Sequence, residues 1–564
     1  MPRGKVLVLG RDERAFLAVV RSLGRAGLSV HVAWCPRDAV ALRSRWIEAA
    51  HDLPPYTPDD DAWKHALEAL LRRERYDLVV PCSDPTLIPL QLHRDELSAH
   101  ARLYTLPTRA YAVAFDKRAS HELAASLGVP VPRERVLTAP VDVDAVRAEF
   151  GLPLVLKPRA SFKARDLGRK RLVRTIAAPD ALEHALRGLA PGTDVLVQEV
   201  VPGIGVGVEL LAERGRLLAV FQHARVHEPQ RGGGSSYRVS EAPTPALVDA
   251  SARLMAALEW TGVAMVEFRV DRARGTWAFL EINGRFWGSL PLAVAAGADF
   301  PAWLYDLLVE GRREFPSAHR VGLYARNLVR DAAWVRENRH APPAVRVPLA
   351  RVAAEAARVL AGRERWDTLA ADDPGPGLAE LARLAGRAAT RVAARASAVV
   401  AGLPAARRAR AARARQALAD AEHVLFVCKG NICRSPFAEA YARRALAGKT
   451  VASSGYFPRP DRIAPPEAVE AAREVGIDLG GHRSSVLTAD LVDAADAVFV
   501  FDEENHRTVR TQFPHARAKL HRLGDLAPNA ERDIADPYGR SLEDFRRAYR
   551  TIIRLLDGFA AARR

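Results

Sequence analysis

VCKGNICRSP, residues 427–436, places a short polar loop between an apolar run and a segment with the composition of a helix. The run HVLFVC (423–428) predicts a buried strand. Pro436 suits the first turn of a helix over PFAEAYARRAL, where a missing amide hydrogen costs nothing. A loop between a strand and a helix N-terminus turns its amides toward one point, so the stretch predicts an anion-binding loop.

Cys428 and Arg434 are the reactive pair that such a loop would position. Loop amides, the helix dipole and the arginine all favour the thiolate of Cys428, which would be a nucleophile facing a bound oxyanion. Arg434 could hold two oxygens of that anion, and Ser435 could donate to the sulfur and help it leave. The other residues of the predicted phosphate loop are Lys429, Gly430, Asn431, Ile432 and Cys433.

IADPYGRS (534–541) offers the acid that hydrolysis of an ester needs. Asp536 would protonate the leaving group and then act as base for the water that hydrolyses a cysteinyl phosphate. The alternative is a buried structural cysteine beside a chance arginine. Because the spacing Cys-x5-Arg-Ser together with a DPY motif is a specific combination, we favour catalysis.

Residues 423–556 resemble the low-molecular-weight protein-tyrosine phosphatases in these motifs and in GIDLGGHRSSVL (476–487). The resemblance implies a doubly wound α/β domain with a parallel sheet that hydrolyses phosphotyrosine in proteins. It implies Cys428 as nucleophile, Arg434 as ligand of the transition state and Asp536 as acid and base. Asn431 would orient the loop, and Tyr538 would flank the substrate entrance.

Cys433 has two interpretations. It could form a reversible disulfide with Cys428 that guards the nucleophile, or it could be a small packing residue. No cysteine follows it in the chain, so the activity of the arsenate reductases on this fold, which need resolving cysteines downstream, is not expected. Ser453 lies near the family's supporting serine.

The first 110 residues alternate strand and helix patterns. KVLVLG (5–10), LSVHVAW (28–34) and YDLVVPCSD (76–84) read as buried strands with helical stretches between them, which predicts a parallel α/β sheet. No GxGxxG follows the first strand, so a dinucleotide site is not indicated.

Two lysines and a group of carboxylates stand out between residues 110 and 310. Lys117 and Lys157 could reach phosphates. Glu281 and Asn283 are two apart and face one side of a strand; with Glu267 they supply three oxygen ligands, which suits Mg²⁺ between ATP phosphates. Arg285, on the same side, would meet the γ-phosphate.

This set resembles the ATP-grasp family over roughly residues 1–310, with the α/β region as its preceding Rossmann-like domain. EINGRFWGS (281–289) is most similar to the carbamoyl-phosphate-synthase-like and carboxylate–amine ligase branch. The resemblance implies a small-molecule carboxylate that is activated by Mg²⁺ and ATP as an acyl phosphate. In VQEVVPG (197–203), Glu199 and Val201 would contact adenine mainly through the backbone.

One segment of the ATP-grasp region departs from the family pattern, and a second has two possible interpretations. The lid PRASFKARDLGRK (158–170) has one glycine, so its contacts would come from Ser161, Lys163 or Arg165. EPQRGGGSSYR (228–238), with Arg231 and Arg238, predicts either a loop that closes over substrate or a flexible connection.

We expect an α/β and α+β multidomain chain divided at 1–110, 111–315, 316–420 and 421–564. The third part is rich in alanine and arginine, and arginines recur every fourth residue from 383 to 395. That stripe predicts a helical linker with a solvated face. The alternative is a basic helix over 378–420 that contacts an anionic membrane surface.

Composition narrows the remaining choices. The net charge of +16 comes with nine lysines and 74 arginines, which indicates a coding bias, and nucleic acid is not expected as a partner because no basic cluster is interleaved with aromatic residues. Four cysteines make no disulfide framework, so we expect a reducing, cytoplasmic location. Two rivals remain: a phosphatase regulated by a nucleotide-sensing, non-catalytic ATP-grasp domain, and a basic scaffold on membrane or nucleic acid.

Overall fold

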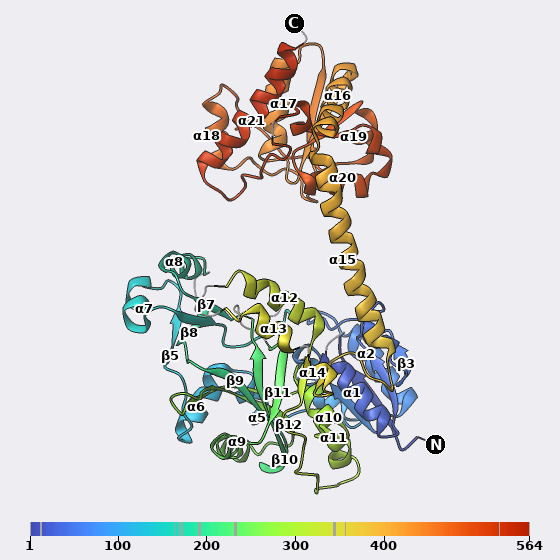
Figure 1. The fold of residues 1–564 in the computed structure, drawn as a ribbon, viewed down its shortest axis with the longest axis vertical. Coiled ribbons are helices and arrows are strands. Elements are labelled where there is room, and N and C mark those ends of the chain that lie inside the picture. The colour runs from blue at the N-terminus through green and yellow to red at the C-terminus, as the bar shows by residue number, and fades with distance from the viewer. Residues whose placement is uncertain are drawn as a thin grey trace. The chain divides into compact units, whose positions relative to one another are not determined.

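The computed structural model describes residues 2–11, 14–162, 164–168, 171, 173–189, 193–229, 234–341, 346–355, 357–529 and 531–562. Lys163 and Arg231 lie outside them. The chain forms two compact units, Met1–Gly386 and Arg387–Arg564 (Figure 1).

The first unit begins with a four-stranded parallel sheet in the order β3-β2-β1-β4. Apolar side chains on both faces of β1 are buried against helices, which confirms the predicted α/β region. The elements are β1 (Lys5–Leu9), α1 (Arg14–Arg25), β2 (Ser29–Ala33), β3 (Ile47–His51), α2 (Ala62–Glu74), β4 (Leu78–Pro81), α3 (Asp84–Leu92), α4 (Arg94–Leu97) and α5 (Thr108–Ala114).

A four-stranded antiparallel sheet follows in the order β5-β8-β6-β7. Its apolar face is covered by α7 and α8, which contribute Val146 and Leu182 to a separate small core. The elements are α6 (Lys117–Ser126), β5 (Glu134–Thr138), α7 (Val143–Phe150), β6 (Leu154–Lys157), β7 (Arg174–Ile176), α8 (Pro179–Arg187) and β8 (Asp194–Glu199).

The largest sheet has seven strands in the order β13-β12-β9-β10-β11-β14-β15. Its pairs are antiparallel except β14 with β15. The elements are β9 (Ile204–Glu213), β10 (Arg216–His227), β11 (Tyr237–Glu241), α9 (Pro245–Ala257), β12 (Gly262–Asp271), β13 (Thr276–Asn283), α10 (Leu290–Ala296), α11 (Phe300–Leu308), β14 (Tyr324–Arg326) and β15 (Glu364–Trp366).

The linker predicted for 316–420 differs from the structure at both ends. β14 and β15 extend the seven-stranded sheet, accompanied by α12 (Leu328–Arg339), α13 (Leu349–Glu355) and α14 (Ala357–Leu360). At the other end, α16 (Pro404–Asp420) buries Ala411, Ala414 and Leu418, and two of these belong to the core of the second unit. The buried face of α16 consists mainly of alanines, and each alanine buries little apolar area. The sequence of this helix therefore looks like that of a solvated helix. Only α15 (Gly375–Gly402) runs through the point of division.

The second unit is a doubly wound α/β domain, as predicted. Its parallel sheet has the order β17-β16-β18-β19, and alternate residues of β16 enter two different cores, one on each face. The elements are β16 (His423–Cys428), α17 (Arg434–Ala445), β17 (Thr450–Gly455), α18 (Pro466–Arg473), α19 (Ala489–Ala494), β18 (Ala497–Val500), α20 (Glu503–Gln512), β19 (Leu520–Arg522) and α21 (Leu542–Ala561).

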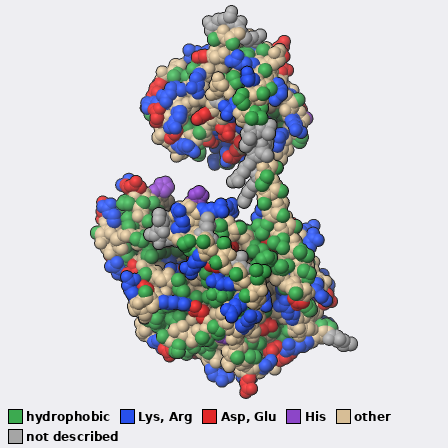
Figure 2. Space-filling model, in the orientation of Figure 1, with side chains coloured by type: hydrophobic (Ala, Val, Ile, Leu, Met, Phe, Trp, Pro, Cys, Tyr) green, Lys and Arg blue, Asp and Glu red, His purple; other side chains and the backbone are tan. Residues whose placement is uncertain are grey.

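On the face seen in Figure 2, Lys and Arg side chains are spread over both units and interspersed with acidic ones. Among the described residues, no helix combines the length and apolar character needed to cross a membrane.

Candidate active sites

The phosphate loop lies between β16, which ends at Cys428, and α17, which begins at Arg434. Cys428 is 3 % exposed at the carboxyl end of the strand. Its Sγ lies 3.2 Å from the Asn431 amide nitrogen, which donates to it, and 3.1 Å from Ser435 Oγ. Two donors therefore converge on the sulfur, as a thiolate requires.

Asn431 determines the shape of this loop. Its backbone is left-handed, with φ 50°, a conformation that asparagine tolerates better than most residues. Its Nδ2 donates to Ser435 Oγ at 3.0 Å and to Ser453 Oγ at 2.8 Å, and its Oδ1 accepts from the Ser485 amide at 2.8 Å. The buried side chain is fully satisfied, so it holds three separate segments together.

The Ser435 hydroxyl is oriented toward the sulfur by its other partner. Because Asn431 Nδ2 donates to Ser435 Oγ, the serine keeps its own proton for an acceptor. The acceptors are Cys428 Sγ at 3.1 Å and the Ser454 carbonyl at 3.3 Å. A charged sulfur is the stronger acceptor, so this arrangement stabilises a thiolate.

Gly455 and His482 support the loop from outside, and we did not predict either. A Cβ on Gly455 would lie 2.7 Å from the Asn431 amide nitrogen and 2.9 Å from the Lys429 carbonyl, so only glycine allows β17 this close. His482 Nε2 lies 2.7 Å from the Asn431 carbonyl. The only sequence signal was the inclusion of His482 in the family-like segment 476–487.

Arg434 is 1 % exposed, and both of its terminal nitrogens have partners. Its Nη1 donates to Asp502 at 2.6 Å and to the Ile534 carbonyl at 2.7 Å, and its Nη2 lies 3.0 Å from Asp536 Oδ2. Burial lowers the pKa of Arg434, but Cys428, Asp536 and Asp502 raise it by more. Its Nε is buried and has no hydrogen-bond partner among the described residues.

Asp536 and Tyr538 lie at the open side of the loop. The Asp536 side chain is 40 % exposed, and its Oδ1 accepts from the Tyr538 amide at 3.3 Å. Tyr538 is 62 % exposed. The structure thus pairs the predicted acid with Arg434 and leaves it partly open to solvent.

Cys433 is buried behind the loop. Burial, with the charge of Cys428, raises the pKa of the Cys433 thiol well above its ordinary value. Tyr549 donates to the Cys433 carbonyl at 3.2 Å. Packing accounts for its position; the disulfide with Cys428 stays a prediction.

In the first unit each of the two predicted lysines lies close to a carboxylate. Lys117 Nζ is 2.8 Å from Glu281 Oε2 and 3.1 Å from Ser161 Oγ, and Lys157 Nζ is 3.5 Å from Glu134 Oε2. Burial lowers the pKa of Lys117, but Glu281, Asp84 and Glu267 together raise it by more. Burial lowers the pKa of Lys157 to about 8, with Lys117 adding to the effect and Glu134 opposing it.

The three predicted metal ligands lie together on one face of the seven-stranded sheet. Glu267 on β12 is the register partner of Glu281 on β13, and Asn283 Nδ2 donates to Glu267 Oε1 at 3.3 Å. Glu267 also forms an ion pair with Arg225 at 2.7 Å. Among the described residues, no three His, Cys, Asp or Glu side chains form a metal-binding group; the predicted set has two carboxylates and one amide.

Arg285 follows this group in the sequence and is paired with a residue of α3 in the N-terminal α/β region. Its Nε is 3.1 Å from Oδ1 of Asp84, which begins α3 after β4. The charge of Asp84 also acts on Lys117. We missed Asp84, although the carboxyl end of a parallel strand is where functional residues gather.

Glu199 and Val201 lie at and just beyond the end of β8. Glu199 Oε1 accepts from the Arg133 amide at 2.9 Å, and its amide donates to the Arg133 carbonyl at 3.1 Å. Val201 is half-buried. Their roles toward adenine stay predictions, as do those of Ser161 and the exposed Arg165.

Two family models match the regions in which these two groups of side chains lie. The family model for low molecular weight phosphotyrosine protein phosphatase matches residues 423–563, and the model for ATP-grasp in the biosynthetic pathway with Ter operon matches residues 192–329. The chain belongs to the low-molecular-weight phosphotyrosine protein phosphatase family through its second unit. It is an enzyme that joins this hydrolase to an ATP-grasp, ligase-like module.

Individual relatives cover the phosphatase almost completely. A probable low molecular weight protein-tyrosine-phosphatase, EpsP, of Ralstonia nicotianae is 38 % identical over 136 residues, which are 24 % of this chain and 92 % of that protein. The protein-arginine-phosphatase of Bacillus subtilis is 37 % identical over 127 residues, 22 % of this chain and 84 % of that protein. The solved structure of N5-carboxyaminoimidazole synthetase from Staphylococcus aureus with ADP is 15 % identical, covers 57 % of this chain and 81 % of its own, and has a TM-score of 0.45.

Proposed function

We propose that the second unit hydrolyses phosphotyrosine and other aryl phosphates through a cysteinyl phosphate. The observation that carries the proposal is the buried Arg434, whose Nε lacks a partner within the described residues while Nη1 is anchored at Asp502. A buried donor without a partner costs free energy that a phosphate oxygen would recover. The same loop presents Cys428 to that phosphate.

In the first step Cys428 Sγ attacks phosphorus, so a sulfur–phosphorus bond forms and the ester phosphorus–oxygen bond breaks. Asp536 gives its proton to the departing phenolate oxygen. Arg434 and the loop amides hold the equatorial oxygens, which carry more charge in the transition state than in the substrate. Tyr538, exposed beside the acid, would flank the aryl ring.

In the second step water attacks phosphorus and Asp536 takes its proton. The sulfur–phosphorus bond breaks and inorganic phosphate leaves with Cys428 again a thiolate. Ser435 and the Asn431 amide stabilise that leaving sulfur, since both lie within 3.2 Å of it.

Hydrolysis of p-nitrophenyl phosphate tests this assignment. The Cys428→Ser variant should lose all activity, and a Cys35→Ser variant in the other unit should keep it. Activity retained by Cys428→Ser would refute the proposal. Because a relative is a protein-arginine-phosphatase, phosphotyrosine and phosphoarginine peptides should be compared directly; a preference for phosphoarginine would replace the aryl ester as substrate.

For the first unit we propose activation of a small-molecule carboxylate by ATP as an acyl phosphate. The adjacent buried cations Lys117 and Lys157 fit the phosphates of a nucleotide, and Glu267, Glu281 and Asn283 fit Mg²⁺, which when bound would neutralise and orient those phosphates. Arg285 would leave Asp84 to meet the transferred group.

A second candidate function is nucleotide sensing without catalysis. It is favoured because each of the two carboxylates proposed to bind Mg²⁺ already forms an ion pair with a cation of the protein. Glu281 is paired with Lys117 and Glu267 with Arg225, so a metal must compete with resident cations. Calorimetry with Mg²⁺ and ATP, and ADP release with a panel of acids and amines, separate the two. Binding that is lost in Glu281→Gln together with ADP release supports the ligase; binding without release for any acid supports sensing; unchanged affinity in Glu281→Gln refutes the metal site.

A further inference from the structure

Arginines lie on the same face of the seven-stranded sheet as the predicted metal ligands. Arg225 on β10 and Arg238 on β11 are register partners in an antiparallel pair, so their side chains leave the sheet on one side, directly opposite each other. Arg225 forms an ion pair at 2.7 Å with Glu267, one of the predicted metal ligands on this face. Like charges opposite one another destabilise a sheet unless an anion lies near them.

Two further guanidinium groups come from helices. Arg14 of α1 donates from Nη1 to the Ser235 carbonyl at 2.9 Å. A Cβ on Gly234 would lie 3.5 Å from Arg14 Nη2 and 4.0 Å from Arg330 Nη1, so Arg14 and Arg330 of α12 flank the same point. Arg14, Arg225, Arg238 and Arg330 are called the arginine cluster below.

In the described part of the chain, three carboxylates face the four guanidinium groups of the arginine cluster. Arg225 pairs with Glu267 and, at 3.5 Å, with Glu228, which also pairs with Arg269. Asp367 pairs with Arg238 and lies 3.8 Å from Arg14. Arg238 is fully buried, and its Nε and Nη1 have no hydrogen-bond partner among the described residues. Burial, followed by the charge of Arg238, lowers the pKa of Arg14 to about 9. The cluster therefore carries excess positive charge.

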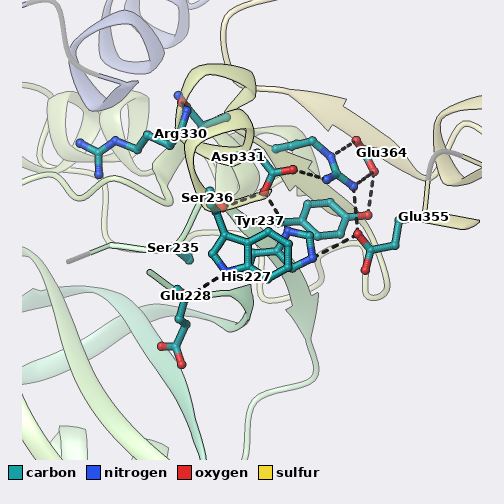
Figure 3. A network of polar contacts seen from close by, with 12 residues as sticks. His227, Glu228, Ser235, Ser236, Tyr237, Arg330, Asp331, Glu355 and Glu364 are labelled. Carbon is teal, nitrogen blue, oxygen red and sulfur yellow. Dashed lines mark hydrogen bonds and ion pairs between the residues drawn. The ribbon is translucent and has the colours of Figure 1, made fainter. Parts of the chain in front are cut away.

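The other acids nearby are already engaged elsewhere. Figure 3 shows Asp331 and Glu355 bonded to His227, at 2.8 and 3.2 Å. Arg326 binds Asp331, Glu355 and Glu364. In the same view Arg330 points away from this network, and among the described residues no carboxylate forms an ion pair with it. The network thus holds α12 in place without neutralising Arg330.

We propose that the arginine cluster binds an anionic group of the acid that the ATP-grasp module activates, so that the substrate carries a second negative group, a carboxylate or a phosphate, besides the reacting carboxylate. This inference rests on the proposed ligase function. Arg14 and the exposed Arg330 contact the second group, because guanidinium forks match both carboxylate and phosphate oxygens. Arg225 lies between that group and Glu267, and the buried Arg238 supports the cluster from behind.

The test measures ADP release at saturating Mg²⁺ and ATP, in the full chain carrying Cys428→Ser so that phosphorylated probes are not hydrolysed. The probes are acetate and propionate with one negative group, succinate and glutarate with two carboxylates, and 3-phosphoglycerate with a carboxylate and a phosphate. Acids with two negative groups should stimulate ADP release more than acids with one. If the dicarboxylates stimulate it more than 3-phosphoglycerate does, the second group is a carboxylate; if 3-phosphoglycerate is the stronger activator, it is a phosphate. Arg330→Gln and Arg14→Gln should raise the half-saturating acid concentration at least tenfold with little change in kcat, whereas Arg336→Gln on the same helix should not.

Equal stimulation by acetate, or unchanged acid saturation in both variants, would overturn the inference. A raised KM for ATP in these variants, with unchanged acid saturation, would assign the cluster to the nucleotide and also overturn it. Calorimetry with succinate and 3-phosphoglycerate separates this inference from the ligase function. Binding that Arg330→Gln abolishes, without ADP release for any acid, supports the arginine site and refutes acyl phosphate formation.

Discussion

Lys157 makes ATP binding by the first unit measurable as proton uptake. Its side chain is 5 % exposed at the end of β6, and burial, against the opposing charge of Glu134, lowers its pKa from 10.5 to about 8. Polyphosphate beside the ammonium group should return that pKa above 10. Binding should then take up roughly 0.1 proton at pH 7, about half a proton at pH 8 and roughly 0.9 at pH 9.

The assay is isothermal titration of Mg²⁺ and ATP in buffers of different ionisation enthalpy. The slope of the observed enthalpy against that of the buffer gives the number of protons exchanged. Lys157→Met, similar in length but uncharged, should abolish the uptake at pH 8 and weaken binding. Tight ATP binding by the unaltered chain without proton uptake at pH 8 would refute the placement of Lys157 at the phosphates.

The same lowered pKa predicts how stability depends on pH without nucleotide. The folded state binds the Lys157 proton less tightly than the unfolded state, so the cost of burying the charge is fully present below pH 8 and disappears as pH rises toward 10.5. The shift corresponds to about 3 kcal/mol. Lys157→Met should therefore stabilise the first unit at pH 7 and by less than about 1 kcal/mol at pH 10, as thermal unfolding would show; Glu134 keeps His121 as a partner at 2.9 Å. A stability gain independent of pH would contradict the titration of Lys157.

Three further predictions concern the phosphatase. Gly455→Ala should lower kcat at least tenfold, because the new Cβ would lie 2.7 Å from the Asn431 amide nitrogen, whereas Gly481→Ala, with nothing within 4 Å, should be neutral; equal rates would mean that β17 does not shape the loop. Asp536→Asn should lower kcat/KM, which reports the first step, for phenyl phosphate by roughly 10²–10⁴ and affect p-nitrophenyl phosphate less, since its leaving group needs no proton. Equal losses of kcat/KM for both esters would argue against general-acid catalysis. Ser435→Ala should cost about 1.5–3 kcal/mol of transition-state stabilisation, seen as a slower release of phosphate in stopped-flow measurements, and a rate unchanged within twofold would exclude its bond to the sulfur.

Much of the second unit could be predicted because its chemistry is local. The predicted nucleophile Cys428, Arg434 and Ser435 lie within eight residues, and a strand–loop–helix pattern by itself orients the loop amides. The supports could not be predicted in this way. Asp502, His482 and Gly455 come from distant strands and loops, and only the parallel order of β17, β16 and β18 brings them to one edge.

In the first unit, too, local features could be predicted from the sequence and distant contacts could not. Alternation along one strand was enough to place Glu281 and Asn283 on one face. The contact of Glu267 with Arg225 depends on strand register between β12, β9 and β10, and the contact of Arg285 with Asp84 depends on the packing of α3 of the N-terminal parallel sheet. Neither has a sequence spacing that could reveal it. The linker predicted for 316–420 missed β14 and β15 for a related reason, since these strands are three residues each and too short for a periodic pattern.

The sequence by itself determined the two families that this protein joins, because each has a short motif of distinctive residue types: Cys428 to Ser435 in one unit and Glu281 to Arg285 in the other. Tertiary structure alone decided what surrounds them. It left the Nε of the buried Arg434 without a hydrogen-bond partner among the described residues, lowered the pKa of Lys157 and gathered arginines from two strands and two helices on the face that carries Glu267. Burial and charge proximity depend on which distant segments pack together, and no local pattern encodes that.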